Sequence, residues 1–314
     1  MTVRTAYRGT RYGFRPGKSQ HQALDRLFKE VSFEGKRYII DADMKNYFGT
    51  IDHKWLRSFL DQRIKDGVIR KMIDKWLKAG ISEDGQVIYP EEGTPQGGVI
   101  SPLLSNIFLH YALEVWFKDQ IQPLLKGSSF IIRFADDFLI GFTHKEDAER
   151  VMKVLPKRFA KYGLILHPDK THLVKLDEEQ DKGGKTFDFL GFTHYMSTSR
   201  KGKRILNRRT SKKKLRLALI KMNDWMRRNR HKPVKWVISE LNLKLRGYYG
   251  YYGVTFNYRQ MMVYYLKVKR MLHKWLNRRG GKTSWSWVRF SMLVERHIPL
   301  LKPKIYHSYQ LAKP

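Results

Sequence analysis

The chain has 314 residues, of which 42% are hydrophobic and 13% aromatic, so we expect a packed globular protein with room for two domains. It has no cysteine, which excludes disulfides, cysteine nucleophiles and cysteine-based zinc sites. The sequence has no long apolar run and no signal-peptide core at its start. We therefore expect a soluble protein of the cytoplasm or of an organelle.

The net charge of +33 is distributed unevenly along the chain. Residues 196–314 carry 31 lysines and arginines against three acidic residues, a net charge of +28, which leaves +5 for residues 1–195. A polycation of this kind attracts phosphate backbones, so nucleic acid is the expected partner and a membrane is not. A generally adhesive basic protein stays open as an alternative. An anionic membrane surface is less favoured, because the basic residues do not form one amphipathic anchor.

Residues 1–195 are expected to form an α+β layer, in which an antiparallel sheet is backed by helices. Two apolar runs, 129–134 and 138–142, predict a β-hairpin with Asp136 and Asp137 at its turn. Ser101 and Pro102 predict the start of a long helix that reaches about residue 124. The other expected elements are a helix capped by Ser19 that extends through Leu27, helices at 53–64, 68–78 and 146–162, and strands at 37–43, 87–89, 164–166, 173–174 and 187–195.

A boundary is expected near residues 196–207, because the pattern beyond it is helical. Helices are predicted at 212–228, 233–252, 258–278 and 284–297, with Pro233 suited to a helix start and two glycines before the last helix. The expected domains are therefore residues 1–195 and a basic, all-α domain of residues 196–314.

Three aspartates are the candidates for chemistry: Asp43, after the strand at 37–43, and the adjacent Asp136 and Asp137. Adjacent carboxylates repel one another, and burial raises the energy of the pair unless cations hold it. Two Mg²⁺ ions about 4 Å apart would relieve this repulsion and support phosphoryl transfer. Asp is also common in turns, so a solvated hairpin tip is the alternative for Asp136 and Asp137.

Several short segments resemble, in order, the sequence blocks of reverse transcriptases of the group II intron and retron type. They are YGFRPGKS at 12–19, ADMKNYF at 42–48, GTPQGGVISPL at 93–103, FADD at 134–137, KT at 170–171, FLGF at 189–192 and, in the basic domain, RGYYGYY at 246–252. The resemblance implies a right-hand polymerase palm with remnant fingers, followed by an α-helical thumb or maturase domain. It implies an RNA-directed DNA polymerase that uses dNTPs and two Mg²⁺ ions, with Mn²⁺ as a substitute.

The resemblance also implies roles for single residues. Asp43 and Asp136 would hold the metals directly, with Asp137 as a weaker ligand. Phe48 would lie against the sugar of the incoming nucleotide and exclude a 2′-hydroxyl, unless it is a core residue. Lys170 would neutralise the pyrophosphate, unless it is a solvated surface lysine. The residues implied at the template-primer and the nucleotide are Pro95, Gln96, Gly97 and Gly98, for which a plain turn before a helix is the alternative.

In the family, a fingers segment precedes the block at 12–19 and supplies basic residues for the triphosphate. Without it, triphosphate binding is expected to fall on Arg15, Lys18 or Lys45, or on a fingers segment supplied by a separate chain. No Cys/His-rich endonuclease module follows the basic domain, so second-strand cleavage of a DNA target is not expected from this chain. An RNA-binding maturase, or half of a split enzyme, whose palm is only a scaffold, is the alternative to the polymerase.

Basic residues of the second domain are the candidates for binding intron RNA or template RNA and assisting splicing. Most tryptophans between them are expected in the core, because helices must bury one face. Only three acidic residues lie in this domain, too few to pair most of its cations. The candidate RNA-binding residues are Arg208, Arg209, Lys212, Lys213, Lys214, Arg216, Arg227, Arg228, Arg230, Arg246, Lys267, Lys269 and Arg270.

Overall fold

The computed structural model describes residues 11–78, 81–83, 86–88, 93–94, 98–177, 179, 183–279 and 284–309. The chain divides into two compact units. The first unit comprises Met1–Leu190 with Tyr195–Leu206, and the second comprises Gly191–His194 with Asn207–Pro314. Within the described ranges, no helix is both long and apolar enough to cross a membrane.

The core of the first unit contains a four-stranded antiparallel sheet in the order β4-β5-β1-β6. Its strands are β1 (Tyr38–Ala42), β4 (Ser129–Phe134), β5 (Asp137–Phe142) and β6 (His172–Lys175). Strand β5 is buried at every position from Phe138 to Phe142, which means that both faces of the sheet are covered. The predicted hairpin is confirmed, since Phe134 pairs with Asp137 across a two-residue turn.

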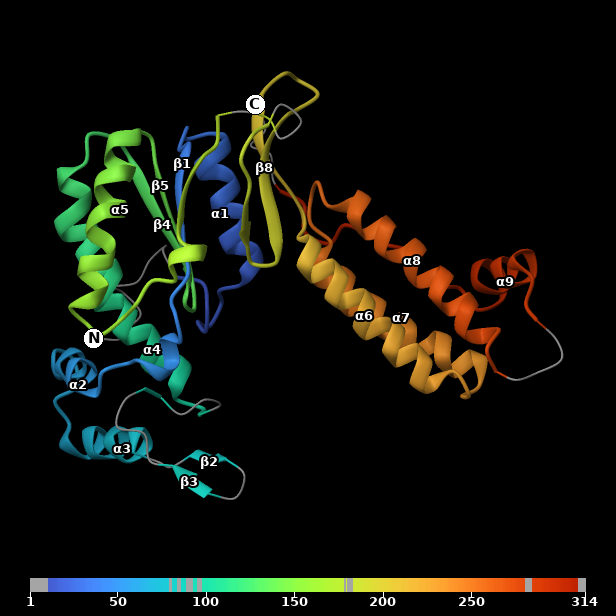
Figure 1. Ribbon diagram of the computed structural model, residues 1–314, viewed down its shortest axis with the longest axis horizontal. Coiled ribbons are helices and arrows are strands. Elements are labelled where there is room, and N and C mark those ends of the chain that lie inside the picture. The colour runs from blue at the N-terminus through green and yellow to red at the C-terminus, as the bar shows by residue number, and fades with distance from the viewer. Residues whose placement is uncertain are drawn as a thin grey trace. The chain divides into compact units, whose positions relative to one another are not determined.

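Helices cover the sheet on both sides, and Figure 1 shows the strands between α1 and α5. On one face, side chains such as Ile40 and Ile140 share a hydrophobic core with Phe108 and Leu155. The helices of this unit are α1 (Gln20–Ser32), α2 (His53–Asp61), α3 (Gly67–Leu77), α4 (Ser101–Leu109) and α5 (Lys145–Ala160). Helix α1 begins with a capping box between Ser19 and Gln22, which fixes its first turn. It extends five residues beyond the predicted end at Leu27.

The long helix predicted from residue 101 changes geometry along its length. Regular α-helix ends at Leu109, and π-helical turns follow over His110–Val115 and Phe117–Ile121. A 3₁₀ turn at Gln122–Leu124 contains Pro123 and closes the segment, because proline cannot continue a helical hydrogen-bond ladder. The predicted extent is confirmed, whereas the expectation of one uniform helix is wrong.

The described residues also form two smaller sheets. Strands β2 (Ile81–Glu83) and β3 (Gln86–Ile88) form a pair, and β7 (Phe187–Phe189), β8 (Phe192–Thr198) and β9 (Arg204–Thr210) form a three-stranded sheet. The single strand predicted at 187–195 is broken at Leu190 and Gly191, whose φ angles of 50° and 79° turn the chain. The strand predicted at 164–166 is reduced to one bridge between Leu166 and Met44.

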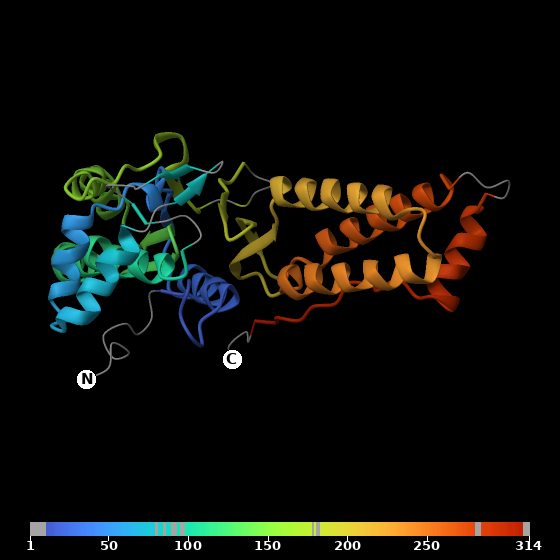
Figure 2. The same ribbon diagram turned by 90° about the horizontal axis from the view of Figure 1, so that it is seen from below.

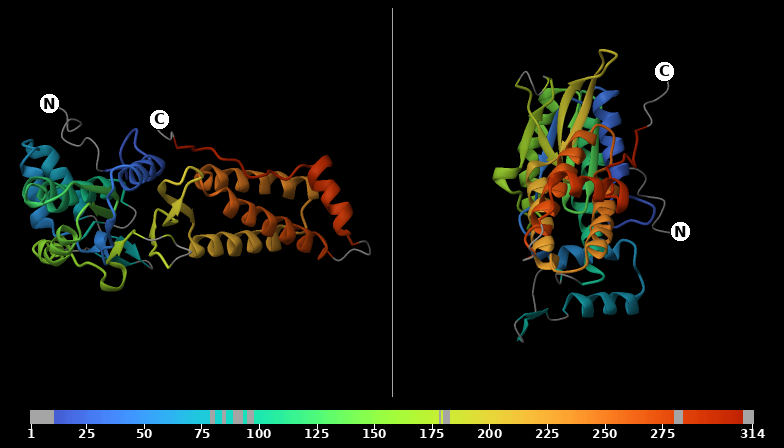
Figure 3. Two further views of the ribbon diagram at one scale, coloured as in Figure 1. Left: turned by 90° about the horizontal axis from the view of Figure 1, so that it is seen from above. Right: turned by 90° about the vertical axis from the view of Figure 1, so that its right-hand side faces the viewer.

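The second unit contains the helices α6 (Lys212–Asn229), α7 (Val234–Tyr252), α8 (Tyr258–Leu276) and α9 (Trp287–Met292). Figures 2 and 3 show α6, α7 and α8 lying side by side. Their buried faces form one core, which includes Met222, Leu241 and Leu272. The segment after α9 returns along α7, where Tyr249 donates a hydrogen bond of 3.2 Å to the carbonyl of Leu301. An antiparallel sheet backed by helices, followed by a helical domain, was the prediction, and this α+β arrangement is confirmed.

Candidate active site

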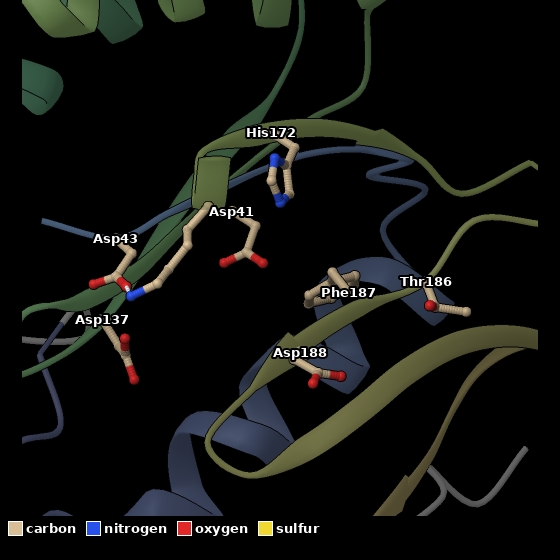
Figure 4. A pocket seen from close by; sticks show the side chains of 8 residues that line it. Asp41, Asp43, Asp137, His172, Thr186, Phe187 and Asp188 are labelled. Atoms are coloured by element: carbon tan, nitrogen blue, oxygen red, sulfur yellow. Dashed lines mark hydrogen bonds and ion pairs between the residues drawn. The ribbon is translucent and has the colours of Figure 1, made fainter. Parts of the chain in front are cut away.

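Two of the three predicted aspartates meet because the sheet is antiparallel. Strand β1 ends at Ala42, which pairs with Phe138 near the start of β5. The residues just beyond this pair, Asp43 and Asp137, therefore lie at the same end of the sheet, and Figure 4 shows both carboxylates at one pocket. The backbone of Asp43 is held from the other side by His167, whose amide donates to the Asp43 carbonyl at 2.8 Å.

The turn that carries Asp136 is tight and strained. Ala135 has a φ of 58°, a left-handed conformation that residues with a Cβ rarely adopt. Gly13 packs directly against this turn, and a Cβ at Gly13 would lie 2.5 Å from the amide nitrogen of Ala135. Glycine at position 13 therefore permits a backbone approach that no other residue would allow.

The carboxylates raise one another's proton affinity. Burial raises the pKa of Asp136, and the charge of Asp43 adds to this effect. Burial, followed by the charges of Asp137, Asp188 and Asp43, raises the pKa of Asp41 to about 8. A site of this kind favours a bound cation, because a cation reduces the repulsion between the carboxylates that raises their pKa values.

Lys170 supplies one cation at this site. Its Nζ donates to Oδ2 of Asp43 at 2.6 Å, and the side chain is 58% exposed while that of Asp43 is 26% exposed. The hydrogen bond to Asp43 and the charge of Asp43 raise the pKa of Lys170, so the ammonium form is favoured. Lys170 is therefore paired with a site carboxylate, which the sequence alone left undecided.

The pocket at this end of the sheet has a volume of about 460 Å³. Besides the predicted residues it is lined by Asp41, His172, Thr186, Phe187 and Asp188, none of which was predicted from the sequence (Figure 4). Asp41 is two residues before Asp43 and so shares its face of β1, a signal that was readable in the sequence. His172 lies opposite Asp41 in the pairing of β6 with β1, and that register is a property of the folded sheet.

The donor atoms at this site fit a hard cation such as Mg²⁺, which prefers carboxylate oxygens. Among the described residues, however, no three acidic or histidine side chains converge closely enough to form a complete ligand set. Mg²⁺ is commonly held by one or two protein carboxylates, with water and substrate phosphates as the other ligands. The arrangement fits an ion held by one or two carboxylates at this pocket, such as those of Asp43 and Asp137, together with a phosphate-bearing substrate.

Phe48 is joined to the start of the predicted template loop. Its carbonyl accepts a hydrogen bond of 2.7 Å from the amide of Thr94, and the amide of Gly93 donates to Ile51 at 2.9 Å. The ring of Phe48 is half-buried and packs against the main core. Pro95, Gln96 and Gly97 lie outside the described residues, whereas the carbonyl of Gly98 accepts from Ser101 at 3.1 Å.

A family model described as reverse transcriptase (RNA-dependent DNA polymerase) matches residues 2–194, more than half of the chain. The chain belongs to the reverse transcriptase family. This confirms the family that the sequence blocks predicted.

Curated relatives of this reverse transcriptase include intron-encoded proteins. The group II intron-encoded protein LtrA of Lactococcus lactis is 44% identical over 99 residues, which are 32% of this chain and 16% of LtrA. The putative COX1/OXI3 intron 2 protein of Saccharomyces cerevisiae is 34% identical over 188 residues, 59% of this chain and 20% of that protein. The matches therefore span about a sixth to a fifth of the length of these relatives. Telomerase from Candida albicans, solved with a fragment of telomeric RNA, aligns with a TM-score of 0.45 at 13% identity, over 91% of this chain and 51% of that one.

Two basic residues predicted to bind the triphosphate lie apart from the pocket of this reverse transcriptase. Arg15 is half-buried, and Lys18 is exposed with its ammonium 5.6 Å from the centre of the Tyr12 ring. Neither is among the described residues that line the pocket. Lys45, the third of these predicted residues, is exposed and lies two residues after Asp43. Its amide donates a hydrogen bond of 2.9 Å to the carbonyl of Ile165.

The predicted RNA-binding residues of the second unit divide by exposure. Arg209 is half-buried, and most of the others are exposed, namely Lys212, Lys213, Lys214, Arg216, Arg227, Arg228, Arg230, Arg246, Lys267 and Arg270. In the described part of the chain, the run on α6 from Lys212 to Arg216 has no acidic partner, whereas Arg227 and Arg228 both pair with Asp224. The run on α6 is therefore the best-placed group for phosphate contacts.

Two of these predictions are wrong as direct RNA contacts. Arg208 is 0% exposed and its guanidinium lies 4.3 Å from the ring centre of Tyr309. Lys269 is 7% exposed and pairs with Glu295 at 2.7 Å. Both side chains face the interior because they occupy the inward positions of β9 and α8.

Proposed function

We propose that this protein is an RNA-directed DNA polymerase, which extends a primer on an RNA template by two-metal nucleotidyl transfer. In this proposal the first unit is the palm and the second is the thumb or maturase domain. The observation that carries it is the meeting of Asp43 and Asp137 at one end of the antiparallel sheet, within a chain of the reverse transcriptase family. Two Mg²⁺ ions would supply charge stabilisation for the attacking and leaving oxygens.

Each residue of the site would then have a separate role in catalysis. Asp43 and Asp136 would bind the ions, with the more exposed Asp137 as a weaker ligand. Lys170, whose ammonium is hydrogen-bonded to Asp43, would neutralise the pyrophosphate leaving group. Phe48 would lie against the sugar of the incoming dNTP, and the loop with Gln96 would hold the template strand.

The test is primer extension on an annealed RNA template with dNTPs and Mg²⁺, comparing the wild type with Asp136→Ala. The proposal predicts extension by the wild type alone and none in EDTA. Salt-sensitive RNA binding without extension by the wild-type protein would reject it in favour of the second candidate.

The second candidate is an RNA-binding maturase that assists the splicing of intron RNA, with the palm as a scaffold or as half of a split enzyme. It is favoured by the exposed run from Lys212 to Arg216 on α6, which lacks acidic partners in the described structure, and by the intron-encoded relatives. It predicts that Asp136→Ala leaves splicing assistance intact, whereas removing the charges at Lys212 to Arg216 abolishes it. Both functions can reside in one protein.

A further inference from the structure

Beneath the turn that carries Asp136 lies a buried cluster of charged side chains. Arg133 on β4 is 1% exposed, and its Nε donates to Oε1 of Glu114 at 2.8 Å. Oε2 of Glu114 lies 3.0 Å from Nε of Arg11 and 3.0 Å from Nδ1 of His110. A buried carboxylate with this many donors is fully engaged, and a guanidinium paired with it has a fixed position.

The cluster is connected to the turn itself. Nη1 of Arg133 donates to the Ala135 carbonyl at 2.7 Å and to Oδ1 of Asn106 at 2.9 Å. Ala135 is the residue with the left-handed φ of 58°, so Arg133 stabilises a conformation that the backbone would not keep alone. Asn106 also donates to the Gly13 carbonyl at 3.0 Å, which fastens the glycine that packs on the other side of the same turn.

The elements that supply these side chains come from distant parts of the sequence. Asn106 belongs to α4, His110 and Glu114 to the π-helical turn that follows it, and Arg133 to β4. Wide helical turns of this kind are frequent at functional sites. Burial opposes the ionisation of Glu114, yet Arg133, the hydrogen bond from His110 and Arg11 hold the pKa of Glu114 below its usual value. The carboxylate is therefore ionised when it holds Arg133.

We propose that Arg133 is a positioning residue, whose guanidinium, held by Glu114 and Asn106, fixes the turn that presents Asp136 and Asp137 to the metals. The inference rests on the proposed polymerase function for its consequence. Arg133 touches neither nucleotide nor metal in this scheme and acts through the Ala135 carbonyl. Lysine cannot replace it fully, because one ammonium cannot reproduce the forked geometry that serves Glu114, Asn106 and Ala135 together.

The test compares Arg133→Met and Arg133→Lys with a matched control, Lys36→Met. Lys36 is also buried and paired, with Glu30 at 3.1 Å, but it precedes β1 at the end of the sheet opposite Asp43. At a temperature where all variants are folded, we expect Arg133→Met to lower the single-turnover rate constant about 10- to 100-fold. We also expect it to raise the Mg²⁺ concentration for half-maximal rate several-fold. Arg133→Lys should be intermediate, and Lys36→Met should change neither quantity.

Hydrogen exchange of the peptide covering residues 129–142 gives a readout that needs no activity. Arg133→Met should speed exchange at the turn by about tenfold or more, whereas Lys36→Met should leave this peptide unchanged. If Arg133→Met does not fold, the same rate, Mg²⁺ and exchange measurements on Arg133→Lys and Asn106→Ser test the role of Arg133. Wild-type exchange, rate and Mg²⁺ dependence in the Arg133 variants would overturn the inference. A wild-type protein that extends no primer would reject the proposed function instead, and the exchange result would still decide the role of Arg133.

Discussion

Two groups of cations, one in each unit, lie in opposite environments. In the first unit Arg133 is buried and shares the carboxylate of Glu114 with Arg11. In the second unit the cations of α6 face solvent, and within the described structure the run from Lys212 to Arg216 has no acidic partner. Buried and paired charge fixes geometry, whereas exposed and unpaired charge attracts a polyanion. The comparison therefore favours the proposal that the first unit carries the chemistry and the second binds RNA.

The largest expected effect belongs to the carboxylates of the first unit. Asp43→Asn and Asp136→Asn should lower the single-turnover rate of primer extension about 1000-fold, because each removes a proposed metal ligand, whose loss would raise the barrier by about 4 kcal/mol. Asp137→Asn should lower it only about tenfold, since this side chain is the most exposed of the three. Asp169→Asn, an exposed acid next to Lys170 that does not line the pocket, is the control and should retain the wild-type rate. Equal rates for all four variants would refute the assignment.

The next effect concerns the second unit. Replacing Lys212, Lys213, Lys214 and Arg216 by glutamine should weaken RNA binding about 100-fold at moderate salt and reduce the slope of log affinity against log salt by about three. The rate constant for bound substrate should change little. A control with the same loss of charge on α5, at Lys145, Arg150, Lys153 and Lys157, should leave affinity within about threefold. Fluorescence anisotropy across a salt series measures both quantities, and equal losses in the two variants would remove the distinction between the units.

A smaller effect is expected at Phe48, where a site role and a core role compete. If the ring lies against the sugar, Phe48→Val should reduce the preference for dNTPs over rNTPs by about tenfold. If the ring serves only the core, the variant should lose stability with the preference unchanged. Single-nucleotide insertion with matched dNTP and rNTP distinguishes the two outcomes.

The smallest effect is a stability effect at Asp41. Its pKa of about 8 is raised above the ordinary value, so the folded state binds this proton more tightly than the unfolded chain does. The resulting stabilisation is complete below about pH 4 and is lost as the pH rises to about 8. In metal-free buffer, the melting temperature of Asp41→Asn minus that of the wild type should therefore increase as the pH rises from about 4 to about 8, by several degrees in total. A constant difference from pH 4 to pH 9 would show that Asp41 does not titrate in this range.

Local signals made much of this molecule predictable from its sequence. Asp43, Asp136 and Asp137 each stand in a short string that marks a strand end or a turn, and the helices of the second unit follow the spacing of their apolar residues. The hairpin of β4 and β5 was predictable for the same reason. These features depend on neighbours in the chain, which a sequence displays directly.

Features that depend on pairing between distant segments were not predictable. His172 comes opposite Asp41 only through the register of β6 with β1, and Glu114 reaches Arg133 only after α4 has packed on the sheet. Arg208 was misassigned because it stands in a basic run, although β9 alternates and buries Leu206, Arg208 and Thr210 on one side. Two-residue alternation was the signal that could have identified this burial.

The central claim is that the two units divide chemistry from binding. Its most direct test measures the dissociation constant and the single-turnover rate on one RNA template with a DNA primer, for Asp43→Asn and for the glutamine variant of Lys212, Lys213, Lys214 and Arg216. The account predicts a lost rate with wild-type affinity for the first variant, and weak binding with a near wild-type rate at saturation for the second. Loss of both quantities in both variants would contradict it.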